Sequence, residues 1–477
     1  MITYLNSSKF EKHNQRTTNN MSNFSEPIKR RNFIKAASAS LLLTSLSSYG
    51  FEFFENEKPK KVGLIGTGWY GTSDLMRLIQ VANVEVVSLC DVDSNFLNET
   101  ALLVSQRQKN GKKPKLFSDY RDMLKNDNLD IVLIGTPDHW HALTCIAALK
   151  SGAHVYVQKP ISVDVIEGEA MVAAARKYNR TVQVGTQRKS TPHLIDVKKQ
   201  IIDTGLLGTI GHVDMACYYH MRANGNPPLQ EVPDFLDYEM WTGPAPMRPY
   251  DGLPHRRWWR TFREYGNGIT GDMCVHMLDT VRWMLDLGWP KRISSEGGIF
   301  VQKDGKSNIS DTQSAVFEYD DLNCNWQHRT WGNPADTDYP WSFKIYGANG
   351  VLKGDVMKAE FIPLDGGETI RFNVLYEREK YPEDLTEKDI ELHAAPATRG
   401  HMIDFLNAIE KGTKPIADIE EGHISTASCI LANLSMDLKR PLIYDPKSRT
   451  VKNDPEATAL LQRSYRGDWE HPHPDTV

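Results

Sequence analysis

Three side chains in this sequence are of types that can oxidise an alcohol. Asp272 and His276 are four residues apart, so they project from one face if their segment is a helix. His276, with an ordinary pKa of about 6.5, can accept a hydroxyl proton. Asp272 can orient the imidazole, raise its basicity or bind a neighbouring hydroxyl. Lys159, between an apolar run and a proline, can stabilise a developing alkoxide.

Simpler interpretations of these residues remain open. Asp272 could cap a helix whose His276 is merely buried, and Lys159 could lie on the surface. A metal site at Asp272, His276 and the adjacent Cys274 would need further ligands, and the sequence offers none at a suitable spacing. We therefore predict no metal.

Oxidation of a carbon needs a hydride acceptor, and a glycine-rich segment indicates one. An apolar run ends in G-x-G-x-x-G, and a helical pattern follows at once. Gly66 allows the tight turn, Gly68 lets the backbone approach a pyrophosphate, and Gly71 lets helix and strand pack closely. The helix N-terminus offers N–H groups to the phosphates. The predicted binding residues of this loop are Gly66, Thr67, Gly68, Trp69, Tyr70 and Gly71.

A carboxylate at the expected distance indicates which dinucleotide binds. Asp91 follows the apolar run Val84–Cys90 and lies 20 residues beyond Gly71. Such a carboxylate can hydrogen-bond the ribose 2′-hydroxyl of NAD, and its charge would repel a 2′-phosphate. We predict NAD rather than NADP.

The chain after the glycine loop alternates apolar runs with helical spacing. The apolar runs are Val84–Cys90, Ile131–Ile134, His154–Val157 and Thr181–Val184, and helical spacing lies between them. Near-continuous apolar strands separated by helices predict a doubly wound parallel sheet over residues 58–186. Ligands bind at the carboxyl ends of such strands, where Thr136, Gln158 and Gln187 fall.

The segments Thr136-Pro137-Asp138-His139-Trp140-His141 and Gln158-Lys159-Pro160 resemble the Gfo/Idh/MocA family of glucose–fructose oxidoreductase and inositol 2-dehydrogenase. The resemblance covers roughly residues 59–440. It implies an α/β protein with an N-terminal Rossmann domain and a C-terminal α/β domain on an open, mostly antiparallel sheet. It also implies a homo-oligomer.

The resemblance extends to single positions. It implies catalytic roles for Lys159 and for the Asp272-x-x-x-His276 motif. It places Thr136, Pro137 and His141 in the loop lining the nicotinamide pocket, and we add Gln158, Lys159 and Gln187 to the cofactor site. The family's usual Glu-Lys-Pro reads Gln158-Lys159-Pro160 here, which puts in doubt any charge pairing by the glutamate.

Residues 187–440 are predicted to form the substrate domain, and residues 441–477 a polar tail. Gly211–Tyr219 and residues 314–319 and 343–346 alternate with period two, as antiparallel strands do, and Gly347–Gly350 marks a turn. Met402–Ile409 and Ile424–Leu438 have helical spacing.

Residues 222–257 are rich in Pro, Gly and aromatic side chains, and we expect a functional loop that selects the substrate. Trp241 and Tyr250 in this stretch, with Trp258 and Trp259 just beyond, can stack on a sugar ring or simply pack. We assign Trp259 and Arg260 to substrate binding; for Arg260 and Arg263 a solvated basic face is an equal alternative.

The first 50 residues are predicted to be a polar lead and an export signal. Arg30-Arg31, followed by Phe33, Lys35 and the weakly apolar run 36–46, resembles a twin-arginine signal. A basic amphipathic helix is the alternative. Because this route carries folded proteins, we expect a periplasmic enzyme that folds around its cofactor and keeps it tightly bound.

Composition excludes several kinds of partner. The 477 residues carry a formal net charge of −5, which argues against nucleic acid or an anionic membrane as partner. No apolar run approaches the roughly 18–20 residues that span a bilayer, so we predict no membrane anchor. The six cysteines lack the spacing of a zinc site or a disulfide framework.

These observations predict an NAD-dependent oxidoreductase that acts on a sugar, polyol or glycoside hydroxyl in carbohydrate breakdown. One alternative keeps the cofactor and cleaves glycosides by transient C3 oxidation and elimination. Another is a non-catalytic sugar- or redox-sensing module.

Overall fold

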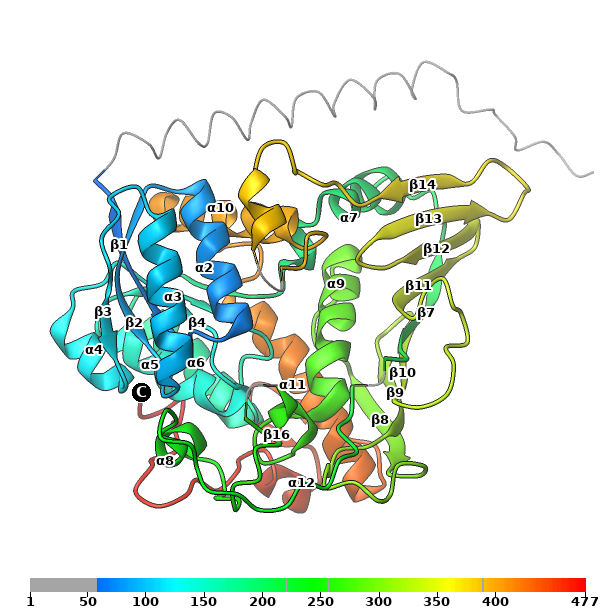
Figure 1. Ribbon diagram of the computed structural model, residues 1–477. Helices are drawn as coiled ribbons and strands as arrows, with labels where there is room; N and C mark the ends of the chain where they lie inside the picture. The colour runs from blue at the N-terminus through cyan, green and yellow to red at the C-terminus, as the bar shows by residue number, and fades with distance from the viewer. Residues whose placement is uncertain (1–57, 220, 256, 388–389) are drawn as a thin grey trace, which may run out of the picture. The chain divides into compact units, whose positions relative to one another are not determined.

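The computed structural model describes residues 58–477 except 220, 256, 388 and 389 (Figure 1). The predicted lead and twin-arginine signal at residues 1–50 lie outside this range. Within it, no helix combines the length and the apolar composition needed to cross a membrane.

The first domain is a six-stranded parallel sheet in the order β3-β2-β1-β4-β5-β6. This is the strand order of a dinucleotide-binding Rossmann fold. Its strands are β1 (Lys60–Ile65), β2 (Val84–Cys90), β3 (Lys115–Phe117), β4 (Ile131–Ile134), β5 (His154–Val157) and β6 (Val182–Val184). Its helices are α2 (Trp69–Val81), α3 (Ser94–Arg107), α4 (Tyr120–Asn126), α5 (His141–Lys150) and α6 (Val165–Lys177). The predicted parallel sheet is confirmed.

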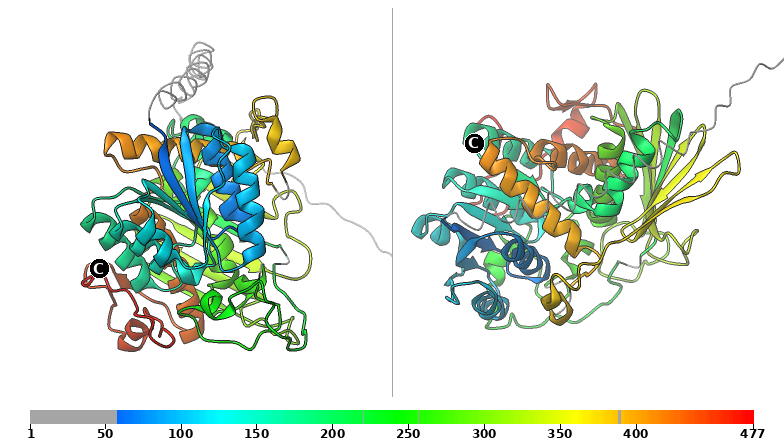
Figure 2. Two further views of the ribbon diagram at one scale, coloured as in Figure 1. Left: turned by 60° about the vertical axis from the view of Figure 1, so that its left-hand side comes forward. Right: turned by 90° about the horizontal axis from the view of Figure 1, so that it is seen from above.

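Both faces of this sheet are covered, which explains why its strands read as continuous apolar runs. Leu64 and Leu133 face a core shared with α2, α3 and a helix from far along the chain, α10 (Ala395–Lys411). Ile134 and Val157 face the opposite core, shared with α4, α5 and α6. Figure 2 shows these helices on the sheet.

The second domain is built on an eight-stranded sheet in the order β14-β13-β12-β11-β7-β10-β9-β8. All neighbours are antiparallel except β7 and β10. The strands are β7 (Ile210–Cys217), β8 (Arg292–Gly298), β9 (Thr312–Glu318), β10 (Asn323–Arg329), β11 (Trp341–Gly347), β12 (Gly350–Gly354), β13 (Lys358–Pro363) and β14 (Ile370–Asn373). This confirms the mostly antiparallel sheet, and the predicted turn at 347–350 joins β11 to β12.

Alternating burial along these strands puts one face of the sheet in a core. Phe343 and Ile345 of β11, for example, are buried, and Lys344 between them is only partly so. That core includes α7 (Pro192–Val197), α9 (Val275–Leu285) and α11 (Ile419–Leu438). The remaining helices are the short α8 (Tyr238–Thr242) and α12 (Pro455–Ala459).

The C-terminal residues 441–477 pack into both domains. Their polar composition predicts a tail instead. Leu442 and Leu461 join the second-domain core, and a small hairpin of β15 (Tyr444–Asp445) and β16 (Thr450–Val451) lies between them in the chain. Farther on, Trp469 makes an edge-to-face contact with Trp140, at 5.0 Å between centroids. The polar character of this segment concealed these few anchoring residues.

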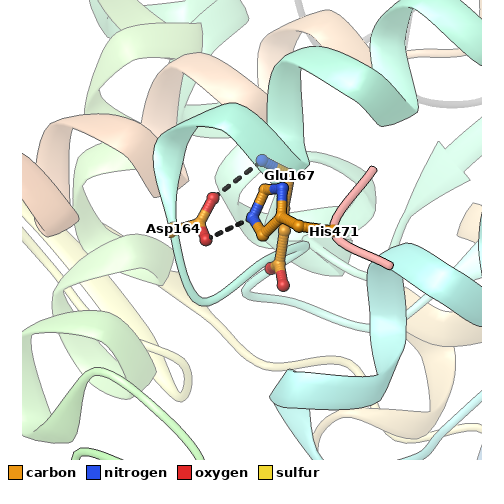
Figure 3. Close-up of side chains that lie close together, drawn as sticks. All are labelled: Asp164, Glu167 and His471. Carbon is orange, nitrogen blue, oxygen red and sulfur yellow. Dashed lines mark hydrogen bonds and ion pairs between the residues drawn. The ribbon is translucent and has the colours of Figure 1, made fainter. Parts of the chain in front are cut away.

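A buried polar cluster fixes the same segment to α6 (Figure 3). Asp164 caps α6 by accepting the Glu167 backbone N–H, and its second oxygen lies 2.8 Å from His471 Nε2. Glu167 accepts hydrogen bonds from Tyr465 Oη and the Val163 backbone N–H. The cluster has the residue types of a metal site, but these carboxylates are already hydrogen-bonded within the protein, so we assign it a structural role.

The cluster predicts a pH-dependent attachment of the C-terminal segment. Although burial opposes it, the hydrogen bond and charge of Asp164 hold the pKa of His471 above its ordinary value. The stabilisation that the His471–Asp164 contact gives to the folded segment is therefore complete below the pKa of His471 in the unfolded chain. It is lost as pH rises through the pKa of His471 in the folded protein. Burial and the charge of Asp164 raise the pKa of Glu167 to about 7, which disfavours the folded cluster further as Glu167 ionises.

We expect His471→Gln to increase local opening of residues 463–477 about tenfold or more at pH 6, because it removes a charge-assisted hydrogen bond. Hydrogen exchange of the C-terminal peptides, corrected for intrinsic rates, measures this. The difference from wild type should shrink by pH 8.5. His473→Gln, which changes a half-exposed histidine 3.6 Å from Asp475, is the control. A pH-independent effect of His471→Gln would contradict the assignment.

Candidate active site

The glycine loop adopts the geometry that its sequence predicts. Gly66 has φ +88°, the left-handed region that favours glycine. A side chain at Gly71 would meet the Gly66 carbonyl oxygen at 2.1 Å, so the close helix–strand approach requires glycine. A Cβ at Gly68, by contrast, would meet no heavy atom within 4 Å. Gly68 is also the N-cap of α2, so open space lies at a helix N-terminus where phosphate can bind.

Asp91 closes this loop from the end of β2. Its Oδ2 accepts hydrogen bonds from the Thr67 backbone N–H at 2.6 Å and from Thr67 Oγ1 at 3.0 Å. Asp91 also borders the cavity described below. The carboxylate is therefore held at the end of β2 and remains accessible to a ribose.

A cavity of about 490 Å³ extends from the glycine loop to the second domain. The predicted residues that line it are Gly66, Gly68, Trp69, Tyr70, Asp91, Thr136, Pro137, His141, Gln158, Lys159, Trp259, Arg260, Asp272 and His276. Thr67, Gly71 and Gln187 are buried beside it. Gln187 reaches the cavity through Tyr70, donating from Nε2 to the hydroxyl oxygen at 2.8 Å. Residues predicted from distant segments thus gather at one site.

Lys159 and Asp272 form an ion pair between the two domains. Lys159 follows β5, and its Nζ lies 2.6 Å from Asp272 Oδ1 and 2.9 Å from the Asp272 carbonyl oxygen. Asp272 lies in a π-helical turn, Thr270–Cys274, that leads into α9. Burial opposes its ionisation, but the charges of Lys159 and Arg260 hold the pKa of Asp272 below its ordinary value. The Asp272 carboxyl is therefore ionised.

His276 differs from the sequence-based expectation in two respects. Burial, with the charges of Lys159 and Arg188, lowers its pKa well below 6.5, so the expectation of an unperturbed pKa is wrong. Asp272 is bonded to Lys159, and the described residues include no hydrogen bond between Asp272 and His276. Nδ1 of His276 is buried without a partner. The imidazole is therefore neutral and free to accept a proton.

The loop that follows β4 is braced by two histidines. The ring nitrogens of His141 lie 2.7 Å from the Pro160 carbonyl oxygen and 3.0 Å from that of Thr136. His141 thus holds the loops that follow β4 and β5 together. His139 Nε2 contacts the Trp241 carbonyl oxygen at 3.0 Å and has a similar bracing role.

The aromatic loop contributes a wall of the cavity. Trp241, Tyr250 and Trp259 share a buried cluster, which supports the packing alternative for Tyr250, whereas Trp241 also borders the cavity. Trp259 also borders the cavity and carries the Arg260 guanidinium on its ring, 4.2 Å from the centroid. Arg260 Nε lies 3.5 Å from Asp272 Oδ2, whereas Arg263 pairs with Asp437 away from the cavity.

Sequence reasoning missed several residues at the site. Asp138, Arg188, Trp341 and Glu391 all line the cavity. Asp138 lies within the motif already noted and Arg188 directly follows Gln187, so their positions gave a usable signal. Trp341 and Glu391 lie far along the chain in segments without a motif. Burial raises the pKa of Asp138 well above its ordinary value, although the charge of the nearby Arg260 opposes this.

Gln158 has a carboxylate partner on α2. Its Nε2 donates to Asp74 Oδ2 at 2.6 Å, and both side chains are buried. Burial raises the pKa of Asp74 to about 7, although the bond to Gln158 and the charge of Arg77 oppose this. The carboxylate absent from the Gln158-Lys159-Pro160 motif is therefore supplied by the glycine-loop helix.

Comparison with known proteins identifies the family. Residues 60–186 match the model described as the oxidoreductase family, NAD-binding Rossmann fold. Residues 193–471 match the C-terminal alpha/beta domain of the same family. The chain belongs to the Gfo/Idh/MocA oxidoreductase family. The predicted family and NAD-binding domain are thereby confirmed.

Curated Gfo/Idh/MocA relatives align with part of the chain. An inositol 2-dehydrogenase/D-chiro-inositol 3-dehydrogenase of Lactiplantibacillus plantarum is 29% identical over 150 residues, covering 31% of this chain and 41% of that protein. A glycosyl hydrolase family 109 protein of Shewanella baltica (strain OS185) is 32% identical over 218 residues, covering 41% and 47%. The alignments thus span less than half of these relatives.

Solved structures share the fold over most of the chain. Levoglucosan dehydrogenase, in complex with NADH and levoglucosan, has a TM-score of 0.61 and 16% identity over 81% of this chain and 99% of that one. An oxidoreductase of Agrobacterium radiobacter, in complex with NAD+, L-tartaric acid and magnesium, has a TM-score of 0.61 and 14% identity, covering 81% and 98%.

The residues of this Gfo/Idh/MocA chain fit the cofactor that its family implies. Open space at Gly68 suits the pyrophosphate, Asp91 is placed for a ribose hydroxyl, and the cavity continues to Lys159 and His276. NAD, when bound, supplies a hydride acceptor.

The buried Asp74–Gln158 pair gives a charge-exchange prediction. Gln158→Glu would place two carboxyl groups in contact, and only one proton would satisfy them. In the folded variant, the pKa values of these two carboxyl groups would be raised above their unfolded values. The loss in free energy of unfolding should therefore grow as pH rises. We expect a loss of about 1–3 kcal/mol at pH 8 and a smaller loss at pH 5.5, measured by thermal unfolding.

The double variant Asp74→Asn/Gln158→Glu is the matched control, since it restores one carboxyl and one amide. It should recover most of the stability at pH 8. Equal stability of Gln158→Glu at both pH values would show that the contact does not persist in solution.

Proposed function

We propose that the protein is an NAD-dependent oxidoreductase that moves a hydride between a carbohydrate hydroxyl and a tightly held nicotinamide cofactor. The observation that carries this proposal is the Lys159–Asp272 pair beside a neutral His276, in a cavity continuous with the glycine loop.

The residues divide the work of alcohol oxidation. His276 accepts the hydroxyl proton, and its neutral state makes it available without prior deprotonation. Lys159 donates a hydrogen bond to the substrate oxygen and stabilises the negative charge that develops there. Asp272 positions Lys159 through their ion pair. The carbon loses a hydride and the oxygen loses its proton, so the hydroxyl group becomes a carbonyl group.

The cavity suits a polyhydroxylated substrate. Arg260, held on the Trp259 ring, and Asp272 offer donors and acceptors for hydroxyl groups next to the one that reacts. Relatives named as inositol and levoglucosan dehydrogenases support a carbohydrate or polyol as substrate. Polysaccharide breakdown is the setting that we propose.

Glycoside cleavage through transient oxidation is a second candidate. The glycosyl hydrolase family 109 relatives favour it, as does Asp138, a buried carboxyl that lines the cavity and whose raised pKa suits proton donation to a leaving oxygen. This reaction consumes no net NAD. Product analysis with an aryl glycoside separates the two, because only cleavage releases the phenol.

Export and assembly form a further part of the proposal. The motif around Arg30-Arg31 supports twin-arginine transport to the periplasm, and the family resemblance supports a homo-oligomer. A protein exported in this way would keep its cofactor. Denaturing purified, dialysed protein should therefore release a dinucleotide, and failure to find one would reject a permanently held cofactor.

We expect His276→Ala and Lys159→Met each to lower turnover about 100-fold or more, because each removes a proton-transfer or charge-stabilising group. The measurement is reduction of the bound cofactor, followed by absorbance, across a panel of sugars and polyols. Dinucleotide content should be unchanged. His212→Ala, a half-exposed position on β7, is the control. Turnover within a few-fold of wild type would reject the assigned role.

A further inference from the structure

Arg188 is a buried charge at the cavity that has no counter-ion among the described residues. It lies in a 3₁₀ turn, Gln187–Ser190, directly after β6, and is 4% exposed. Its Nε and Nη1 are buried without hydrogen-bond partners. Across the described ranges, the Arg188 guanidinium has no ion pair and no hydrogen bond. The guanidinium lies over the Trp341 ring, 5.5 Å from the centroid.

The other buried arginines show how unusual this is. Arg77, Arg282 and Arg399 are paired with carboxylates. Arg222 donates to backbone carbonyls of the loop that precedes β9. Burying a guanidinium is costly unless it is paired. The structure meets that requirement at these four positions and not at Arg188.

The two described carboxylates that act on Arg188 form hydrogen bonds with other groups. Glu391 and Asp355 act on Arg188 through charge, but neither lies at ion-pair distance. Glu391 accepts the Tyr70 hydroxyl at 3.3 Å. Asp355 accepts the backbone N–H groups of Met357 and Lys358 at 2.7 and 2.8 Å. Nε and Nη1 of Arg188 can therefore still donate hydrogen bonds to a ligand in the cavity that Arg188 lines.

Arg188 also lies close to the proposed reaction centre. Trp341 contacts both Arg188 and His276, with 5.4 Å between the Trp341 and His276 ring centroids. Arg188 also interacts through charge with Tyr70 of α2, the helix that the glycine loop opens. An anionic group of a substrate whose reacting hydroxyl meets His276 can therefore reach Arg188 beside Trp341.

We propose that Arg188 binds a carboxylate of the substrate, so that the protein acts on acidic sugars of the uronic acid class. This inference rests on the proposed function and narrows its substrate. A guanidinium matches a carboxylate in both charge and planar geometry. The substrate would supply the partner that Arg188 lacks, and neutral sugars would leave the charge unpaired.

The test compares methyl glycosides of glucuronic, galacturonic and mannuronic acid with their neutral counterparts. Binding to the holoenzyme is measured by calorimetry, and cofactor reduction by absorbance. We expect the wild type to prefer at least one acid over its neutral partner by about 10- to 100-fold. Arg188→Met should abolish that preference while retaining the dinucleotide, and Arg188→Lys should keep part of it. Arg371→Met, at an exposed site on β14, controls for net charge.

The outcomes separate this inference from the proposed function. Equal binding of acidic and neutral sugars, or a preference that survives in Arg188→Met, overturns the role of Arg188. Loss of the dinucleotide from Arg188→Met would assign the side chain to the cofactor and overturn it as well. Tight, Arg188-dependent binding of an acid without cofactor reduction or cleavage would sustain this role and reject the oxidoreductase.

Discussion

The ion pair between Lys159 and Asp272 is the contact on which the rest of the site depends. It joins the end of a parallel strand in the first domain to the helical turn that opens α9 in the second. Both partners are nearly buried, so breaking the pair would leave an uncompensated charge in the site. Burial lowers the pKa of His276, and the charge of Lys159 lowers it further. One contact thus influences the position and the protonation of the groups that would handle the substrate.

Several smaller contacts make this arrangement precise. His141 links the loops after β4 and β5 through two carbonyl oxygens. Gln158, next to Lys159, is tied to Asp74 on the helix that carries the phosphate end of the cavity. Thr67 links the glycine loop to Asp91. The two ends of the cavity are therefore connected through hydrogen bonds between neighbouring strand ends.

The sequence predicts most of what strand ends and local motifs determine. β2, β4, β5 and β6 were found because strands covered on both faces read as apolar runs. The residues after them were found because parallel strands end at one edge. Local patterns carry no information on tertiary partners. For that reason the four-residue spacing predicts His276 as the partner of Asp272, whereas the structure pairs Asp272 with Lys159. The same limit hid Glu391, and the desolvation that sets the pKa of His276 depends on the whole fold.

The return of the chain to its first domain affects how that domain can form. Trp469 packs on Trp140, His471 bonds to Asp164, and α10 covers one face of the parallel sheet. α10 begins 211 residues after β6 ends (184 to 395), and Trp469 and His471 follow later still, so the first sheet cannot fully bury that face during its own synthesis. A fragment of residues 58–186 would expose apolar surface. The boundary between the domains in sequence is therefore not a boundary between independently folding units.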